Sequence, residues 1–264
     1  MNNVVTLPRS NVQTVAIELR GVWYRVNGRN ILREVDLTVE RGTTTAIMGL
    51  SGSGKTTTLR LMMGLVRPTQ GRVFVNGQDI TGLNENDLNQ IRKRMGLVFQ
   101  YGALFDSLTV WENVAFGLLR ERWLSHAEID RIVKEKLEAV GLGQPGVERL
   151  LPAELSGGMK KRVSLARALA FNPDIILYDE PTTGLDPITT NVVNDLIVRM
   201  RDRFNVTSVV VSHDVESMFR IADRIVMIHE GKVIIVGTPD EIRNTTDPIV
   251  RQFIHGDTEG PITV

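Results

Sequence analysis

One stretch of the chain has the residue types and the spacing of a phosphate-binding loop. It matches the pattern G-x-x-x-x-G-K-[ST] and consists of Gly49, Leu50, Ser51, Gly52, Ser53, Gly54, Lys55 and Thr56. Glycines let consecutive backbone N–H groups point inward around anionic oxygens, where a Cβ atom would obstruct the approach. Lys55 would reach the β- and γ-phosphates of a nucleotide, and the Thr56 hydroxyl would bind Mg²⁺. The loop lies between a predicted strand, Thr44 to Met48, and a helix that begins at Lys55, so the pattern favours a nucleotide site over a chance glycine-rich turn.

Two adjacent carboxylates follow an apolar stretch later in the chain. Ile175 to Tyr178 is predicted to form a buried strand, and Asp179 and Glu180 come directly after it. Buried parallel strands present ligand-binding groups at their carboxyl ends, so we expect both acids at one edge of a sheet. Asp179 suits Mg²⁺, bound directly or through water, and Glu180 suits polarising the water that attacks a phosphate. The alternative is a solvated acidic strand end.

A second anion-binding pattern occurs at Ser156, Gly157 and Gly158, where a helix is predicted from Gly158 to Ala170. The N–H groups of a helix start, its dipole and a serine hydroxyl can together hold a phosphate. A chain with one lysine-bearing loop does not need a second cradle for the same nucleotide. We therefore expect this cradle to grip the γ-phosphate of ATP bound by another copy of the chain. The alternative is an ordinary Ser/Gly helix cap.

Further polar residues lie close to these patterns. His213 follows the predicted strand Thr207 to Val211, at a carboxyl-end position that suits a sensor of the γ-phosphate, with a surface histidine as the alternative. The basic run Lys160 to Arg162 lies at a helix start, where it either helps to attract phosphate or forms a solvated basic face.

The elements predicted around these residues form an α/β protein with a helical insertion. Short apolar or alternating stretches predict the strands: Val15–Leu19, Val35–Val39, Thr44–Met48, Arg72–Val75, Gly96–Phe99, Asp174–Tyr178, Thr207–Val211, Val226–Ile228 and Val233–Val236. A mainly helical block at about residues 101–170 interrupts this series. We expect a loose tail at residues 1–14, one domain at 15–243 and a C-terminal tail at 244–264.

The C-terminal tail contains the signals of a short amphipathic helix. Asp247 is a fitting N-cap, Pro248 a fitting first helical residue and Gly256 a fitting stop. Apolar residues four positions apart, such as Ile249 and Phe253, predict one apolar face. That face packs either on its own domain or on another subunit.

Composition limits the classes of function. The chain has 264 residues with 31 Lys and Arg against 31 Asp and Glu, so nothing indicates a nucleic-acid partner. There is no cysteine, hence no disulfide framework and no thiolate metal site. The longest apolar stretches, such as Val206 to Val211, are too short to span a bilayer, and the N-terminal residues lack the apolar region of a secretion signal. We expect a cytosolic protein that needs another protein to act across a membrane.

The order of these motifs resembles the ABC ATPase family over residues 15–240. The series is the phosphate loop, Gln100, Leu155 to Gly158, Asp179 with Glu180, Gly184 to Asp186, and His213. The resemblance implies a P-loop core with an antiparallel β subdomain and an inserted helical subdomain. It also implies that ATP and Mg²⁺ bind and that two copies form a homodimer around ATP.

The resemblance assigns roles to several further residues. It implies that Tyr24 stacks on adenine, that Thr57 belongs to the phosphate loop, and that Asp186 bridges the two copies. Gln100 would touch Mg²⁺ and the γ-phosphate and sense a membrane partner. His213 would hold the γ-phosphate and the attacking water, next to Glu180 as the base.

Three local features resemble the ATPase of MCE-type (Mla-like) lipid transporters: Met159 after the glycine cradle, the segment Phe99 to Val114, and the tail Asp247 to Gly256. This resemblance implies phospholipid cargo, an integral membrane permease, an MCE lipid-binding protein and a STAS-type small subunit, with the chain on the cytoplasmic side of the inner membrane. Two alternatives stay open. One is the ATPase of an amino-acid, metal or phosphonate importer, and the other is a non-transport ABC ATPase acting on DNA or ribosomes.

Overall fold

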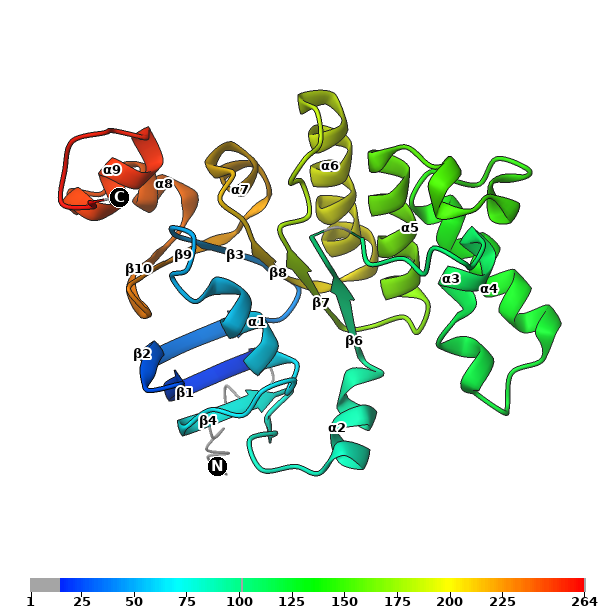
Figure 1. Ribbon diagram of the computed structural model, residues 1–264, viewed down its shortest axis with the longest axis horizontal. Helices are drawn as coiled ribbons and strands as arrows, with labels where there is room; N and C mark the ends of the chain where they lie inside the picture. Colours follow the sequence, from blue (N-terminus) through cyan, green and yellow to red (C-terminus); the bar gives the residue numbers. More distant parts are fainter. Residues whose placement is uncertain (1–14, 101, 264) are drawn as a thin grey trace, which may run out of the picture.

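The structure is a computed structural model that describes residues 15–100 and 102–263. The predicted N-terminal tail (residues 1–14), Tyr101 and Val264 lie outside the described residues. Two sheets meet in the centre of the molecule, and a helical block extends from one side of it (Figure 1). The α/β prediction with an antiparallel sheet and helices is confirmed.

The smaller sheet is antiparallel, with its strands in the order β2-β1-β4-β5. Its strands are β1 (Val15–Val26), β2 (Arg29–Glu40), β4 (Gln70–Val75) and β5 (Gln78–Asp79). The first two strands are much longer than the sequence predicted, because Asn27 and Gly28 form a two-residue turn between them with φ values of 48° and 79°. This Asn-Gly pair is a strong hairpin signal that the sequence analysis overlooked.

The larger sheet is mainly parallel and carries the predicted site motifs. It runs in the order β10-β9-β3-β8-β7-β6. Its strands are β3 (Thr44–Met48), β6 (Met95–Val98), β7 (Ile175–Asp179), β8 (Thr207–Val211), β9 (Arg224–His229) and β10 (Lys232–Gly237). Val211 lies opposite both Ile47 and Asp179 in the parallel register, so β3, β8 and β7 end at one edge of the sheet.

Helices surround the larger sheet and form the inserted block. They are α1 (Lys55–Met62), α2 (Glu85–Arg92), α3 (Val110–Ala115), α4 (His126–Ala139), α5 (Gly157–Leu169), α6 (Pro187–Phe204), α7 (Val215–Ile221), α8 (Pro239–Arg243) and α9 (Pro248–His255). In the block, the predicted capping box of α4 is present, because Ser125 and Glu128 each accept from the other's backbone N–H. Apolar residues such as Val133 and Val163 join α4 and α5 to the core under β6 and β7.

The C-terminal helix packs on its own domain. Asp247 caps α9 by accepting from the N–H groups of Ile249 and Val250 at 2.9 and 3.0 Å. Val250 is fully buried in a small core with Met218 and Ile242, which stabilises the fold by about 1.5–3 kcal/mol. The sequence left open whether the apolar face of this helix packs on its own domain or on another subunit, and in the structure it packs on its own domain. Within residues 15–100 and 102–263, every helix is too short or too polar to cross a membrane.

Candidate nucleotide site

The predicted phosphate loop connects the end of β3 to the start of α1. Gly49 and Gly54 have φ values of 148° and 110°, in a region that L side chains rarely adopt. A Cβ atom on Gly49 would lie 2.1 Å from the carbonyl oxygen of Ile228, and one on Gly54 would lie 2.6 Å from a methyl group of Leu32. Only glycine therefore fits at these two positions, and the loop backbone stays open toward an anion.

Lys55 lies inside the curve of this loop. Its ammonium donates to the carbonyl oxygens of Gly49 and Leu50 at 2.8 and 2.9 Å. Burial lowers the pKa of Lys55, and the nearby carboxylates of Glu180 and Asp179 oppose that shift. Among the described residues, the ammonium donates hydrogen bonds only to carbonyl oxygens, so a bound phosphate would add a negatively charged acceptor in direct contact with it.

Thr56 and Asp179 come together at the end of the sheet. The Thr56 hydroxyl donates to Asp179 at 2.9 Å. Desolvation raises the pKa of Asp179, the hydrogen bond from Thr56 opposes the rise, and the charge of Glu180 adds to it. In the described part of the chain, no group of three or more His, Asp or Glu side chains is placed to hold a metal ion. Two neighbouring oxygen donors nevertheless fit Mg²⁺, which takes one or two protein ligands together with phosphate and water.

Glu180 and His213 contact each other beside Thr56 and Asp179. The Nδ1 atom of His213 lies 2.8 Å from Oε2 of Glu180, which also accepts from the Thr183 hydroxyl at 3.1 Å. The Glu180 side chain is 13% exposed and that of His213 is 62% exposed. Glu180 has φ 51°, a left-handed conformation that is rare for a residue with a Cβ atom.

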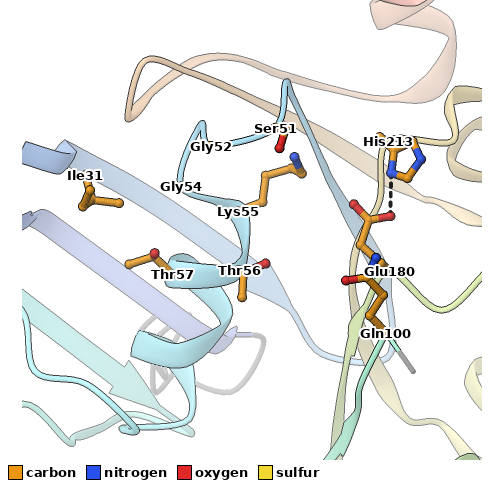
Figure 2. A pocket seen from close by; sticks show the side chains of 10 residues that line it. All are labelled: Ile31, Ser51, Gly52, Gly54, Lys55, Thr56, Thr57, Gln100, Glu180 and His213. Atoms are coloured by element: carbon orange, nitrogen blue, oxygen red, sulfur yellow. Dashed lines mark ion pairs between the residues drawn. The ribbon is translucent and has the colours of Figure 1, made fainter. Parts of the chain in front are cut away.

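A cleft of about 590 Å³ lies between these groups and collects most of the predicted site residues. It is lined by Ile31, Ser51, Gly52, Gly54, Lys55, Thr56, Thr57, Gln100, Glu180 and His213. Figure 2 shows the phosphate loop on one side of the cleft, with Gln100, Glu180 and His213 facing it from the other side. Gly49, Leu50, Ser53 and Asp179 belong to the same loop and sheet edge but do not line the cleft.

Tyr24 is not among the lining residues. Its ring packs against the buried core of the antiparallel sheet, and Tyr24 lies opposite Leu32 in the β1–β2 register. The lining residue from this sheet is Ile31, which the sequence analysis missed because an aliphatic side chain in a strand carries no functional signal. The contact of Tyr24 with adenine stays a prediction.

The second cradle lies outside this cleft. Ser156 is exposed and caps α5 by accepting from the Met159 N–H at 3.2 Å. A Cβ atom on Gly158 would lie 2.4 Å from the Thr189 methyl group, so α5 approaches the start of α6 closely. Asp186 caps α6 and accepts from the Thr189 hydroxyl at 2.6 Å, a bond that lowers the pKa of Asp186. The structure thus joins Ser156, Gly157, Gly158 and Asp186 at one corner, away from the lining of the cleft.

Within the basic run after this cradle, the second lysine is neither part of a solvated face nor directed toward phosphate from the surface. Lys161 is 6% exposed and donates to the carbonyl oxygens of Gln100 and Glu180. Burial lowers the pKa of Lys161 to about 8. Arg162 donates to the carbonyl oxygen of Gly141. Both readings offered by the sequence are therefore wrong for Lys161, because neither considered that the residue points inward.

The parallel sheet, the glycine loop with its buried lysine and the acids at the neighbouring strand end define the site of a P-loop NTPase. A family model described as "ABC transporter" matches residues 32–183. The chain therefore belongs to the ABC transporter family, whose P-loop ATPases bind and hydrolyse ATP.

Individual relatives agree with this assignment. The chain is 46% identical over 246 residues to the "Intermembrane phospholipid transport system ATP-binding protein MlaF" of Haemophilus influenzae, covering 93% of this chain and 92% of that one. The protein of the same name from Escherichia coli K12 is 43% identical over 252 residues, covering 95% and 93%. A solved dimeric ATP-binding cassette, in a post-hydrolysis state with ADP and Pi, superposes with a TM-score of 0.77 at 33% identity, covering 84% of this chain and 98% of that one.

Proposed function

We propose that this chain is the ATP-hydrolysing subunit of an ABC transporter that moves phospholipids across the cell envelope. The observation that carries the cargo assignment is the identity of 43–46%, over more than nine-tenths of the chain, to two subunits of intermembrane phospholipid transport systems. Met159 and the helix α9 are two of the three local features by which the sequence resembles such systems. No residue of this chain is assigned a contact with lipid.

Hydrolysis is assigned to the groups that face the phosphate loop across the cleft. The Glu180 carboxylate accepts a proton from the attacking water, and His213 at 2.8 Å orients that carboxylate and contacts the γ-phosphate. Gln100 faces the phosphate loop from the same side of the cleft as Glu180 and contacts the γ-phosphate. Lys55 and the N–H groups of the loop stabilise the charge that develops on the phosphate oxygens.

Thr56 and Asp179 would hold Mg²⁺, with Gln100 as a further oxygen ligand from the same cleft. The metal would neutralise phosphate charge during transfer. Asp179 suits this role because its carboxylate is desolvated and has Thr56 as its only side-chain donor among the residues described.

Lys55→Ala is expected to weaken ATP binding by about 10- to 100-fold, because a hydrogen bond to a charged group contributes about 1.5–3 kcal/mol. The fold should survive, since the lysine is desolvated and is held by two carbonyl oxygens of the same loop. Calorimetric titration with ATP measures the affinity. The matched control is Lys232→Ala, which removes an exposed lysine of β10 outside the cleft. Equal affinities of the two variants would remove Lys55 from the phosphate site.

The ATP site is completed by a second copy of the chain. One chain offers two phosphate-binding ends, the loop of the cleft and the exposed start of α5, and these do not share one cleft. In a head-to-tail homodimer, Ser156, Gly157 and Gly158 of each copy would close on the γ-phosphate of the other, and Asp186 would bridge the interface. The similar solved cassette is itself dimeric.

A permease is the second partner. A broad groove runs between the helical block and the edge of the parallel sheet, and aromatic side chains at residues 99, 105, 116 and 171 line it. Phe99 and Phe105 are each 42% exposed in this one groove, and contiguous exposed apolar surface marks sites of protein interaction. The groove is next to Gln100, so a permease segment seated there would sense closure of the ATP site.

An MCE lipid-binding protein and a STAS-type small subunit complete the proposed complex. In this complex the chain lies on the cytoplasmic face of the inner membrane.

Affinity purification of the complex from membranes, followed by mass spectrometry of proteins and lipids, tests the proposal. We expect a permease, an MCE protein and enriched phospholipid. A solute-binding protein in place of the MCE protein would favour an amino-acid, metal or phosphonate importer. Recovery with ribosomes or DNA at physiological salt would contradict a transport function.

A further inference from the structure

A buried lysine outside the recognised motifs connects three parts of the site. Lys161 lies in the first turns of α5, five residues after Ser156, and is 6% exposed. Its ammonium lies between the carbonyl oxygens of Gln100 and Glu180, with the second at 3.3 Å. The side chain therefore points away from the exposed cradle and into its own subunit, toward the two residues to which hydrolysis is assigned.

The backbone of Glu180 is held through its carbonyl oxygen, which accepts from Lys161, and through its N–H group. Glu180 has φ 51°, and its own N–H donates to Val211 at 2.9 Å. With Lys161 on its carbonyl oxygen, the residue is held at both ends in a left-handed conformation that is uncommon for a residue with a Cβ atom. This conformation directs the carboxylate toward His213, so the lysine contributes to where the base points.

The carbonyl oxygen of Gln100 begins a segment that α5 holds at several places. Farther along the same helix, Arg167 donates to the carbonyl oxygens of Gly102 and Ala103 at 3.0 and 2.8 Å. Lys161 holds the near end of this segment, at the residue whose side chain enters the cleft. A shift of α5 along its axis would therefore move Gln100 as well.

We infer that Lys161 is a positioning residue that ties the α5 cradle to Gln100 and Glu180 of the same subunit. This inference rests on the proposed hydrolysis at Glu180 and on the composite site. When the cradle closes on ATP held by the facing copy, α5 moves, and Lys161 transmits that movement to the base and the glutamine of its own site. The two ATP sites of the dimer are thereby coupled through one side chain in each subunit.

The test uses the full-length chain with three variants. Lys161→Met is expected to lower kcat about 10- to 100-fold, in line with the loss of a buried charge-assisted hydrogen bond, while the Kd for ATP stays at the wild-type value. Lys161→Arg, which keeps cationic donors, should restore most of the turnover. Lys160→Met removes the adjacent, partly exposed lysine and should behave like the wild type. If Lys161→Met does not fold, Lys161→Gln replaces it, with a kcat between those of Lys161→Arg and Glu180→Gln.

A second measurement separates positioning from a general structural role. Because Lys161 acts in part through Glu180, adding Lys161→Met to Glu180→Gln should lower turnover by a clearly smaller factor than Lys161→Met does in the wild-type chain. Wild-type kcat in Lys161→Met, an arginine variant as slow as the methionine variant, or a loss in the double variant equal to the product of the two single losses would each overturn the inference. If Glu180→Gln abolishes turnover while Lys161→Met does not, the proposed function stands and only the role of Lys161 fails.

Discussion

Glu180→Gln is expected to lower the turnover of ATP by about 10²–10⁴-fold, the usual contribution of a general base. The amide keeps the size of the side chain and can still contact His213, but it cannot take a proton from water. ATP binding should persist, so that the variant accumulates as ATP-bound dimers. Steady-state phosphate release gives the turnover, and gel filtration with ATP and Mg²⁺ gives the dimer.

The matched control is Glu230→Gln. Glu230 also has a left-handed backbone, with φ 47°, but it lies exposed in the turn between β9 and β10. Its replacement should leave both turnover and dimer formation unchanged. Near-normal turnover in Glu180→Gln would show that another group activates the water.

Ser156→Arg should abolish hydrolysis while leaving the binding of ATP to a single subunit intact. Ser156 does not line the cleft of its own chain, so a bulky side chain there cannot obstruct the phosphate loop directly. It would instead block the approach of a facing copy. Turnover and the Kd for ATP are therefore expected to separate, with the first lost and the second retained.

Ser125→Arg controls for the loss of a helix cap. Ser125 is an exposed N-cap of α4, and its hydroxyl accepts a backbone N–H three residues on, as that of Ser156 does. Losing such a cap costs about 0.5–2 kcal/mol of stability, and this cost should be similar in both variants. If the two variants hydrolyse ATP equally well, the start of α5 has no part in the reaction.

The central motifs could be predicted from the sequence because each is a local pattern with a local physical cause. The phosphate loop needs glycine backbone angles, and the acids follow a fully apolar strand. We expected the phosphate loop and the two acids to lie close together because each follows the carboxyl end of a strand. The parallel register, in which Val211 lies opposite both Ile47 and Asp179, confirms this expectation.

Features that depend on the direction of a side chain could not be predicted in the same way. Lys161 belongs to a run of three basic residues, and only the packing of α5 on the segment after β6 decides that it points inward. Ile31 lines the cleft through the long β1–β2 hairpin, whose extent depends on the turn at residues 27–28.

Cross-linking tests most directly whether two copies complete the ATP site. The chain has no cysteine, so single cysteines can be introduced without a background reaction. Ser51→Cys in the phosphate loop and Ser156→Cys at the cradle are made in separate chains that also carry Glu180→Gln, and the chains are mixed with a short bifunctional thiol reagent. We predict a covalent dimer of the two chains with ATP and Mg²⁺, and little of it with ADP. The absence of an ATP-dependent cross-link between the phosphate loop of one chain and the cradle of the other would contradict the composite site.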